Sequence, residues 1–314
     1  MKNNLLKNWM KKWLLEIKQT VKESTYNSYK NTVKNHIVGK LGDYRIAELN
    51  NKIIQNYVFA LIKNGRTDGK GGLSLTVVKH IVMLLKLAIK KPINDETIFN
   101  KIFLIKFPHE YKNSKIDVLS TEEQKAIIKL VQMNLNYKTM GILFCLSTGI
   151  RIGELCALQW KDVDLNSRTV HIKRTIQRIY TNNILNNKKS KIIFSFPKTQ
   201  NAYREIPLST ILINLLTQIK FSKNDFLLSG GKKYVEPRVY RRFFESFLRK
   251  HKLRQIKFHG LRHTFATKCV ENKVDYKIIS ELLGHTSITT TLNLYVHPNM
   301  EEKRRCVENL LDVL

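Results

Sequence analysis

Apolar side chains in the first third of the chain recur three and four positions apart, which is the spacing of helices that pack through one face. Five such segments lie between residues 1 and 106, separated by short polar or glycine-containing turns. The apolar positions of the first three segments are, in order, Trp9, Trp13, Leu14 and Ile17; Tyr26, Tyr29, Val33 and Ile37; and Ile53, Ile54, Tyr57, Val58 and Leu61. The fourth segment spans about 74 to 90, and the fifth spans 94–102. This pattern predicts an all-α region.

Several residues in this region favour helix ends. Ser24 and Asn50 are expected to cap the second and third helices, because their side chains can accept hydrogen bonds from the first turn. Gly39 and Gly42 are expected to end the second helix, and Gly65 the third.

The pattern changes after residues 107–118, a polar run with a proline that indicates a linker. Ser120 and Glu123 then form a capping box before an apolar helix. Alternation around Asn166 and Ser167 predicts a β-hairpin, and strands are expected at 191–196 and in 197–208, with a turn between two strands in the latter.

The remaining segments favour helices again. Ser209 can cap a helix that runs through Lys220, and 237–251 predicts a basic amphipathic helix. Its inward positions are Phe243, Phe244, Phe247 and Leu248, and its basic positions are Arg238, Arg241 and Arg242. We therefore expect a two-domain protein: an all-α domain over 1–106, a linker over 107–118, and a mixed α+β, mainly helical domain over 119–314 with a small antiparallel sheet.

Composition adds a strong positive charge to this picture. The chain has 55 Lys and Arg against 25 Asp and Glu, a formal net charge of +30, which predicts a polyanionic partner. A genome rich in A and T also raises Lys, Asn and Ile, but it does not explain why acidic residues are scarce. No apolar run reaches the ~18 residues of a membrane span, and no signal peptide is expected.

The four cysteines show no metal-binding or redox spacing. Cys145, Cys156, Cys269 and Cys306 lie among apolar neighbours without a C-x-x-C pair. They are expected to be buried, reduced thiols of a cytoplasmic protein.

The candidate chemistry is concentrated in residues 259–295. His259 and Arg262 share one helix face, His285 follows the helix stop at Gly284, and Tyr295 lies on a third short helix. A phenol with a pKa of about 10 is a poor nucleophile unless cations and a proton acceptor lie nearby. Arginine suits the bidentate binding of phosphate, so the predicted target is a phosphodiester.

Apolar and capping positions indicate how this stretch packs. The expected core positions are Leu261, Phe265, Cys269 and Val270 in the first helix, and Ile278, Ile279, Leu282 and Leu283 in the second. Asp275 can cap the second helix, and Thr286 or Ser287 can cap the third.

The motifs H-x-x-R at 259–262 and L-G-H at 283–285, followed by Tyr295 ten positions after His285, resemble the C-terminal signature of the tyrosine recombinases, the integrase family. Two motifs earlier in the chain complete the resemblance. T-G-x-R-x-x-E-L matches at Arg151 and Glu154, and P-K-T-x-x-x-x-R-x-I-P-L matches at Lys198. The resemblance covers nearly all of the second domain and fits the size and helicity of the first.

The resemblance implies a site-specific recombinase of a mobile element, which acts on double-stranded DNA through a 3′-phosphotyrosyl intermediate and needs no metal or cofactor. It implies a core-binding first domain in a short Xer-like architecture without an arm-binding domain. The expected roles are Tyr295 as nucleophile, Arg151 and Arg262 on the phosphate oxygens, Lys198 as acid for the leaving oxygen, His259 as proton acceptor, His285 as donor to the phosphate, and Glu154 as an orienting group. Arg238, Arg241 and Arg242 are expected to contact DNA.

The resemblance also implies a homo-tetramer on two DNA sites. The tail 300–314, which is expected to be helical with apolar Val307, Leu310 and Leu311, either closes its own domain or docks on a neighbouring subunit.

Alternatives remain at this point. The same pocket fits a type IB topoisomerase-like enzyme, and the basic faces fit a DNA-binding protein that no longer cuts. Arg151 and Glu154 could form only a surface ion pair. His259 and His263 have the i, i+4 spacing of zinc ligands, but no glutamate lies between them, so His263 is expected to pack or hydrogen-bond structurally.

Overall fold

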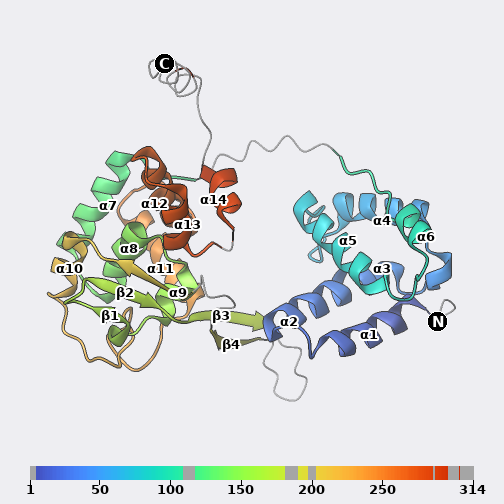
Figure 1. Ribbon diagram of the computed structural model, residues 1–314, viewed down its shortest axis with the longest axis horizontal. Helices are drawn as coiled ribbons and strands as arrows, with labels where there is room; N and C mark the ends of the chain where they lie inside the picture. The colour runs from blue at the N-terminus through green and yellow to red at the C-terminus, as the bar shows by residue number, and fades with distance from the viewer. Residues whose placement is uncertain are drawn as a thin grey trace, which may run out of the picture. The chain divides into compact units, whose positions relative to one another are not determined.

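The computed structural model describes residues 5–108, 117–180, 190–196, 203–285, 287–295 and 304. The chain divides into two compact units. Unit 1 comprises Met1–Asn113 and Ile179–Lys191, and unit 2 comprises Ser114–Arg178 and Ile192–Leu314. Figure 1 follows the elements of both units along the chain.

The N-terminal part of unit 1 is entirely helical where it is described, as its apolar periodicity predicts. Its elements are α1 (Leu6–Ile17), α2 (Glu23–Thr32), a π-helical turn (Val33–Val38), α3 (Gly39–Leu41), a 3-10 turn (Ile46–Glu48), α4 (Asn51–Asn64), α5 (Leu75–Ile89) and α6 (Glu96–Ile102). The apolar stripes of these helices form one core.

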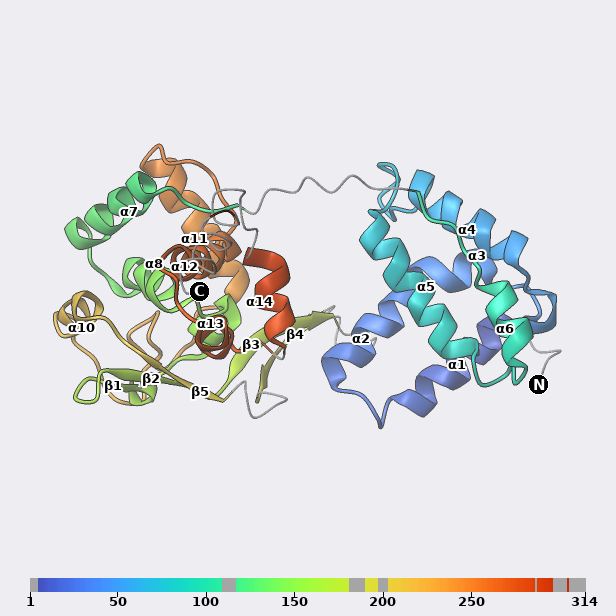
Figure 2. The same cartoon turned by 45° about the horizontal axis from the view of Figure 1, so that its top comes forward.

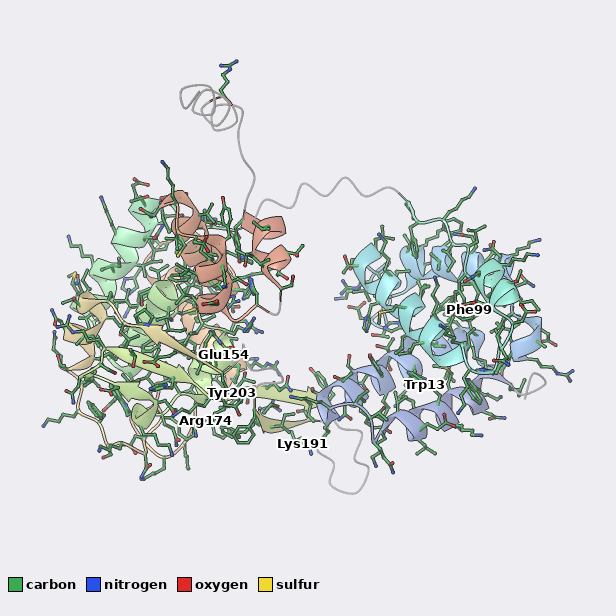
Figure 3. The ribbon with its side chains drawn as sticks, in the orientation of Figure 1. Trp13, Phe99, Glu154, Arg174, Lys191 and Tyr203 are labelled. Carbon is green, nitrogen blue, oxygen red and sulfur yellow. The ribbon has the colours of Figure 1, made fainter. Side chains whose placement is uncertain are left out.

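Tryptophans of α1 hold this core together. Nε1 of Trp9 donates to the carbonyl of Ala88 near the end of α5, at 2.8 Å. Trp13, labelled in Figure 3, stacks on Tyr29 of α2 with ring centroids 6.0 Å apart. These contacts connect the first helix to two others that follow it in the chain.

Most predicted helix ends in unit 1 are confirmed, and two, at Ser24 and Gly39, are wrong. The Asn50 side chain accepts from the backbone N–H of Ile53, and Gly65 follows the end of α4. Ser24, however, lies inside α2, which begins at Glu23 after an extended Lys22. The carboxylate of Glu23 in the first turn complements the positive end of the helix dipole, which favours the earlier start.

The helical path after α2 also differs in detail from the prediction. It continues through Gly39 in α3 and ends at Gly42.

The elements that follow combine helices with two small sheets. They are α7 (Thr121–Met133), α8 (Tyr137–Thr148), α9 (Ile152–Ala157), a 3-10 turn (Trp160–Asp162), β1 (Val163–Asp164), β2 (Thr169–Ile172), β3 (Thr175–Tyr180), β4 (Ser190–Ser195), β5 (Arg204–Pro207), α10 (Thr210–Leu216), α11 (Pro237–Lys250), α12 (His259–Glu271), α13 (Tyr276–Leu283) and α14 (Ile288–Tyr295). The mainly helical α+β fold class is therefore confirmed. The predicted capping box is present, with Ser120 and Glu123 each accepting from the other's backbone N–H.

The two sheets divide the strands in an unexpected way. β1, β2 and β5 form an antiparallel sheet in which Val170 lies opposite Ile206, and the hairpin predicted around residues 166–167 is confirmed. β4 pairs instead with β3, so the strands before and after segment 197–202 belong to different sheets. The sequence does not predict β3, because its buried residues Ile176 and Ile179 are three positions apart. Residues on one face of a strand recur every second position, so this spacing hides the strand pattern.

Helix α8 is buried on most sides, and α7, α9, α10, α11 and α12 pack against it. Its residues Thr139–Cys145 are buried, as expected for a helix that is apolar all round. α12 packs against α8, and α13 and α14 lie beside α12 in both views (Figures 1 and 2). The turn after α8 is thereby brought next to the helices of segment 259–295.

Several smaller expectations have mixed outcomes. The helix after Ser209 ends at Leu216 rather than near Lys220. Ile278, expected to face the core, is 51% exposed, whereas Ile279 and Leu283 are buried. Ser287 caps α14 by accepting from the backbone N–H of Thr289.

Cys145 and Cys156 are free and buried, and Cys269 is free and half-buried. Cys306 and, apart from Arg304, the tail 300–314 lie outside the described residues. Over the described part of the chain, no helix has the length and apolar character to cross a membrane.

Candidate active site

The C-terminus of α13 gathers three arginines from three other elements. The last carbonyls of a helix lack partners within it and carry partial negative charge, so cations bind there favourably. Three consecutive carbonyls of α13 and its cap each accept from a different guanidinium. The pairs are Arg204 Nε to Leu282 (2.7 Å), Arg262 Nη2 to Leu283 (2.8 Å) and Arg151 Nη2 to Gly284 (3.0 Å).

Two glycines make this convergence possible. Gly149 ends α8 and Gly284 ends α13, and both have positive φ, 64° and 63°. A Cβ on Gly149 would lie 2.5 Å from the ring of Phe265, and one on Gly284 would lie 2.9 Å from Arg204. Arg262 also donates to the carbonyl of Gly149 at 2.8 Å, so one guanidinium joins the two helix ends.

Glu154 is the carboxylate at the centre of this arginine cluster. Arg151 Nη1 donates to it at 2.9 Å, and Arg204 donates through both terminal nitrogens, at 2.8 and 3.2 Å. Burial alone would raise the pKa of Glu154, but the hydrogen bonds and charges of Arg204 and Arg151 lower it to about 2. Glu154 is only 7% exposed, so its pairing with Arg151 is not a surface ion pair (Glu154 is labelled in Figure 3).

The cluster carries excess positive charge. Among the described residues, three guanidiniums (Arg151, Arg204 and Arg262) surround one carboxylate. Burial and the charge of Arg151 lower the pKa of Arg262 to about 9, which leaves it a cation at neutral pH. The side chain of Arg151 is 40% exposed, whereas that of Arg204 is 6% exposed. The accessible cation and the uncompensated charge together favour binding of an anion.

Helix α14 places a tyrosine beside these cations. Thr291 and Tyr295 are four residues apart and share one face of α14. Thr291 Oγ1 lies 2.8 Å from Nδ1 of His285, which fixes that face toward the end of α13. Burial raises the pKa of the Tyr295 phenol, while the charges of Arg262 and Arg151 oppose that rise.

The phenol has a histidine as its hydrogen-bond partner. Oη of Tyr295 lies 2.7 Å from Nδ1 of His263, one turn beyond His259 on α12. The rings of His259 and His263 meet edge to face, with centroids 4.6 Å apart. The structural hydrogen bond expected at His263 is therefore present, and its partner is the tyrosine hydroxyl.

The histidines around the phenol are neutral at physiological pH. Desolvation, together with the charges of His263 and the arginines, lowers the pKa of His259 to about 4. Desolvation and the charges of Arg262 and Arg151 lower the pKa of His285 to about 4. The positive charge of the site therefore resides on guanidiniums, and the imidazoles can accept protons.

Most of the predicted site residues come together, with two exceptions. Arg151, His259, Arg262, His285 and Tyr295 influence one another's ionisation and lie in one cluster. Lys198 falls outside the described residues. The three basic residues of α11 are exposed, opposite a buried face that contains Tyr240 and Phe244.

Two residues of the cluster are not among those predicted from the sequence. Arg204 occupies the arginine position of the P-K-T-x-x-x-x-R-x-I-P-L motif, and this match could have identified it as a site residue. His263 follows Arg262 directly and shares a helix face with His259. Over the described residues no group of three or more His, Cys, Asp or Glu is placed to hold a metal ion, so the His259–His263 pair has no third ligand there.

Comparisons with known proteins agree with the motifs. Residues 117–302 match the phage integrase family, and residues 5–62 match the phage integrase N-terminal SAM-like domain. A tyrosine recombinase XerC-like protein of Caldanaerobacter subterraneus subsp. tengcongensis is 31% identical over 232 residues, which is 68% of this chain and 58% of the relative. A tyrosine recombinase of Thermosipho africanus is 26% identical over 85% of this chain and 86% of its own length.

Solved structures share the fold. The Tn1549 transposon integrase in complex with transposon right end DNA has a TM-score of 0.78 and 20% identity, and covers 98% of this chain and 100% of its own. A lambda integrase dimer bound to a core site has a TM-score of 0.63 and 17% identity, and the match covers 93% of this chain and 95% of the lambda integrase chain. This chain spans about half the length of the first curated relatives that it matches.

Glu154→Gln tests the electrostatic centre of the site. Removing the carboxylate leaves two guanidiniums without their anion, so the free energy of unfolding should fall by roughly 3–5 kcal/mol at pH 7. The pKa of Glu154 is lowered from 4.5 to about 2, so its stabilising effect is complete above pH 4.5 and is lost as pH falls toward 2. Urea unfolding at several pH values should show the variant and the natural chain converging in that window.

Glu271→Gln is the matched control, because this exposed carboxylate pairs with Lys268 on the surface. It should change the free energy of unfolding by less than about 1 kcal/mol. Equal effects of the two substitutions would contradict a special role for Glu154.

Proposed function

Because this chain belongs to the phage integrase family, we propose that it is a site-specific DNA recombinase that cuts and rejoins DNA through Tyr295. The observation that carries the proposal is the phenol of Tyr295 beside a cationic cluster built from Arg151, Arg204 and Arg262. A phosphodiester is an anion that gains charge on its non-bridging oxygens during attack, so such a cluster stabilises its transition state.

The proposed cleavage step begins with attack of the Tyr295 oxygen on phosphorus. A 3′-phosphotyrosyl link forms and the bond to the 5′-oxygen breaks. Arg151 and Arg262 stabilise the non-bridging oxygens, and His285 donates a hydrogen bond to one of them. Lys198 protonates the leaving 5′-oxygen. Attack by a second 5′-hydroxyl reverses these steps and joins the new strand.

Buried contacts support the positioning part of this mechanism. Glu154 holds Arg151 from one side while the carbonyl of Gly284 accepts from the other. Arg262 is held by two carbonyls and is 2% exposed. Groups fixed before the substrate arrives need little reorganisation in the transition state, which is the main source of electrostatic catalysis.

We propose double-stranded DNA as the partner and a mobile element as the setting. The solved neighbours include the Tn1549 transposon integrase with circular intermediate DNA. Curated relatives include the ICEBs1 integrase of Bacillus subtilis and the transposase of Tn916 from Enterococcus faecalis. The N-terminal helical domain over 1–106 would bind the core DNA, and exposed Arg238, Arg241 and Arg242 of α11 would contact phosphates.

We further propose a homo-tetramer on two DNA sites, with the tail 300–314 docking in trans. A lambda integrase tetramer bound to a Holliday junction is among the structural neighbours. Unit 2 has a cavity of about 640 Å³ that exposed Tyr203, Ile278 and Ile288 help to line (Tyr203 is labelled in Figure 3). The sequence predicts an apolar helix stripe in the tail that contains Leu310 and Leu311, and we propose that this stripe contacts the apolar part of the cavity lining.

Tyr295→Phe tests the proposed function. The natural chain should form a covalent adduct on a nicked DNA substrate whose cleaved fragment diffuses away, and peptide mass spectrometry should place the DNA on Tyr295. The variant should bind the same DNA but form no adduct, because the phenyl ring lacks the attacking oxygen. Tyr276→Phe, at an exposed tyrosine of α13, should retain the adduct.

An adduct that persists in Tyr295→Phe, or a natural chain that makes none on DNA from its own element, would refute the proposal. Supercoil relaxation by a monomer without strand exchange would support the topoisomerase-like alternative instead.

The exposed arginines of α11 have a separate test. Replacing Arg238, Arg241 or Arg242 with Ala should weaken DNA binding and reduce the slope of log affinity against log salt by about 1 for each phosphate that the variant no longer binds. Lys129→Ala, at an exposed lysine of α7, is the basic control and should leave the slope unchanged. Fluorescence anisotropy from low to moderate salt measures the slopes. Parallel salt lines for all the variants would exclude α11 as a DNA-binding element.

Deletion of residues 300–314 tests the proposed tetramer. The deletion should leave binding to a single DNA site intact but reduce tetramer formation on paired DNA sites, measured by analytical ultracentrifugation. Ile278→Asp should do the same through the receiving cavity without unfolding the domain, because Ile278 is 51% exposed. Met133→Asp, at an exposed site on α7, is the control. Full tetramer formation by the tail deletion would rule out docking in trans.

A further inference from the structure

We propose that His263, rather than His259, accepts the proton of Tyr295 when the phenol oxygen attacks the phosphodiester. This inference rests on the proposed function and assigns one of its proton transfers. The observation behind it is the 2.7 Å separation between Nδ1 of His263 and Oη of Tyr295. A general base must lie within about 2.6–3.2 Å of the atom that loses the proton, and His263 meets that requirement before DNA is bound.

The position of His259 makes it a poorer base for this proton. It is the first residue of α12, and no hydrogen bond joins it to Tyr295 among the described residues. The rings of His259 and His263 instead meet edge to face, with centroids 4.6 Å apart. His259 and His263 are one turn apart on the same helix face, so a base role assigned from spacing alone could not choose between them.

The surroundings of the phenol favour an internal proton acceptor. Tyr295 is 8% exposed, so its hydroxyl has little contact with bulk water. Burial raises its pKa above the ordinary value, which makes loss of the proton to solvent unfavourable at neutral pH. A neutral imidazole already hydrogen-bonded to the hydroxyl avoids that cost, because the proton moves only along an existing hydrogen bond.

The proton balance of the step is complete. As the bond from Oη to phosphorus forms, the phenolic proton passes to Nδ1 of His263 and the imidazole becomes an imidazolium. The bond from phosphorus to the 5′-oxygen breaks, and the leaving oxygen takes a proton from Lys198, the proposed general acid. In rejoining, the imidazolium returns its proton to the departing tyrosine oxygen, so one residue serves both directions.

The charges that face His263 link this transfer to the presence of substrate. Desolvation and the positive charge of Arg262 lower its pKa, while Asp117 opposes that effect. Among the residues that the structure describes, its other titratable contacts are His259 and Tyr295, which are neutral at physiological pH. The imidazolium therefore becomes more favourable when the phosphate anion enters the cluster and offsets the arginine charge. Activation of the nucleophile then depends on a bound phosphodiester.

His263→Asn tests the inference, because the amide keeps a hydrogen-bond acceptor near the position of Nδ1 but has no basicity. Adduct formation in single-turnover assays should slow by at least about 10²-fold, the range of general base catalysis, with DNA affinity unchanged. The rise in rate with pH that reports deprotonation of the base should disappear. His259→Asn is the matched variant and should retain that rise.

Two modified reactants distinguish proton removal from other defects. A DNA substrate with sulfur in place of the bridging 5′-oxygen needs no acid for its leaving group, so it should restore the rate of Lys198→Ala but not that of His263→Asn. Fluorotyrosine at position 295 has a more acidic phenol and should selectively restore His263→Asn. If the asparagine variant does not fold, His263→Gln is assayed in the same way, with DNA binding as the measure of folding.

The outcomes separate this inference from the proposed function. If the natural chain forms the Tyr295 adduct and His263→Asn matches its rate and pH profile, the inference is wrong and the function stands. Full rescue of His263→Asn by the sulfur substrate also overturns it, because His263 would then act on the leaving group. If the natural chain forms no adduct, both fail together.

Discussion

The C-terminus of α13 is the constraint on which the rest of the site depends. Its last carbonyls need donors, and the chain supplies guanidiniums from the turn after α8, from β5 and from α12. Each of these arginines is distant in sequence from the others, so this helix end holds three separate parts of the domain together. The bonds are charge-assisted, and those of Arg204 and Arg262 are shielded from water, which makes them stronger than surface pairs.

The same arrangement leaves the cluster with unbalanced positive charge, and that imbalance connects stability with function. Glu154 neutralises part of it, and its own pKa is held at about 2 in consequence. A second carboxylate would neutralise more of the charge but would compete with a phosphate for the same guanidiniums. The cluster instead leaves Arg151 partly exposed, so an arriving anion completes the charge balance.

Helix α14 depends on that framework for the position of its tyrosine. His285 directly follows the cap of α13, and its contact with Thr291 orients α14, so the phenol of Tyr295 meets α12 at His263. The tyrosine, the imidazole that contacts it and the arginine cations are thus placed by one set of helix ends. Sequence similarity to tyrosine recombinases and integrases extends over the same segment, residues 117–302.

Local features of the amino-acid sequence were enough to determine most helices, most of their caps and most residues of the candidate site. Helical periodicity and capping act within about four residues, so Asn50, Ser120 and Gly284 could be assigned correctly without any tertiary information. Only the tertiary structure decided which side chains meet. Arg204 reaches Glu154 across 50 residues, and His263 reaches Tyr295 across 32, distances over which no local pattern carries information. Residues that share one helix face, such as His259 and His263, are equivalent by spacing and become distinct only when another helix packs against one of them.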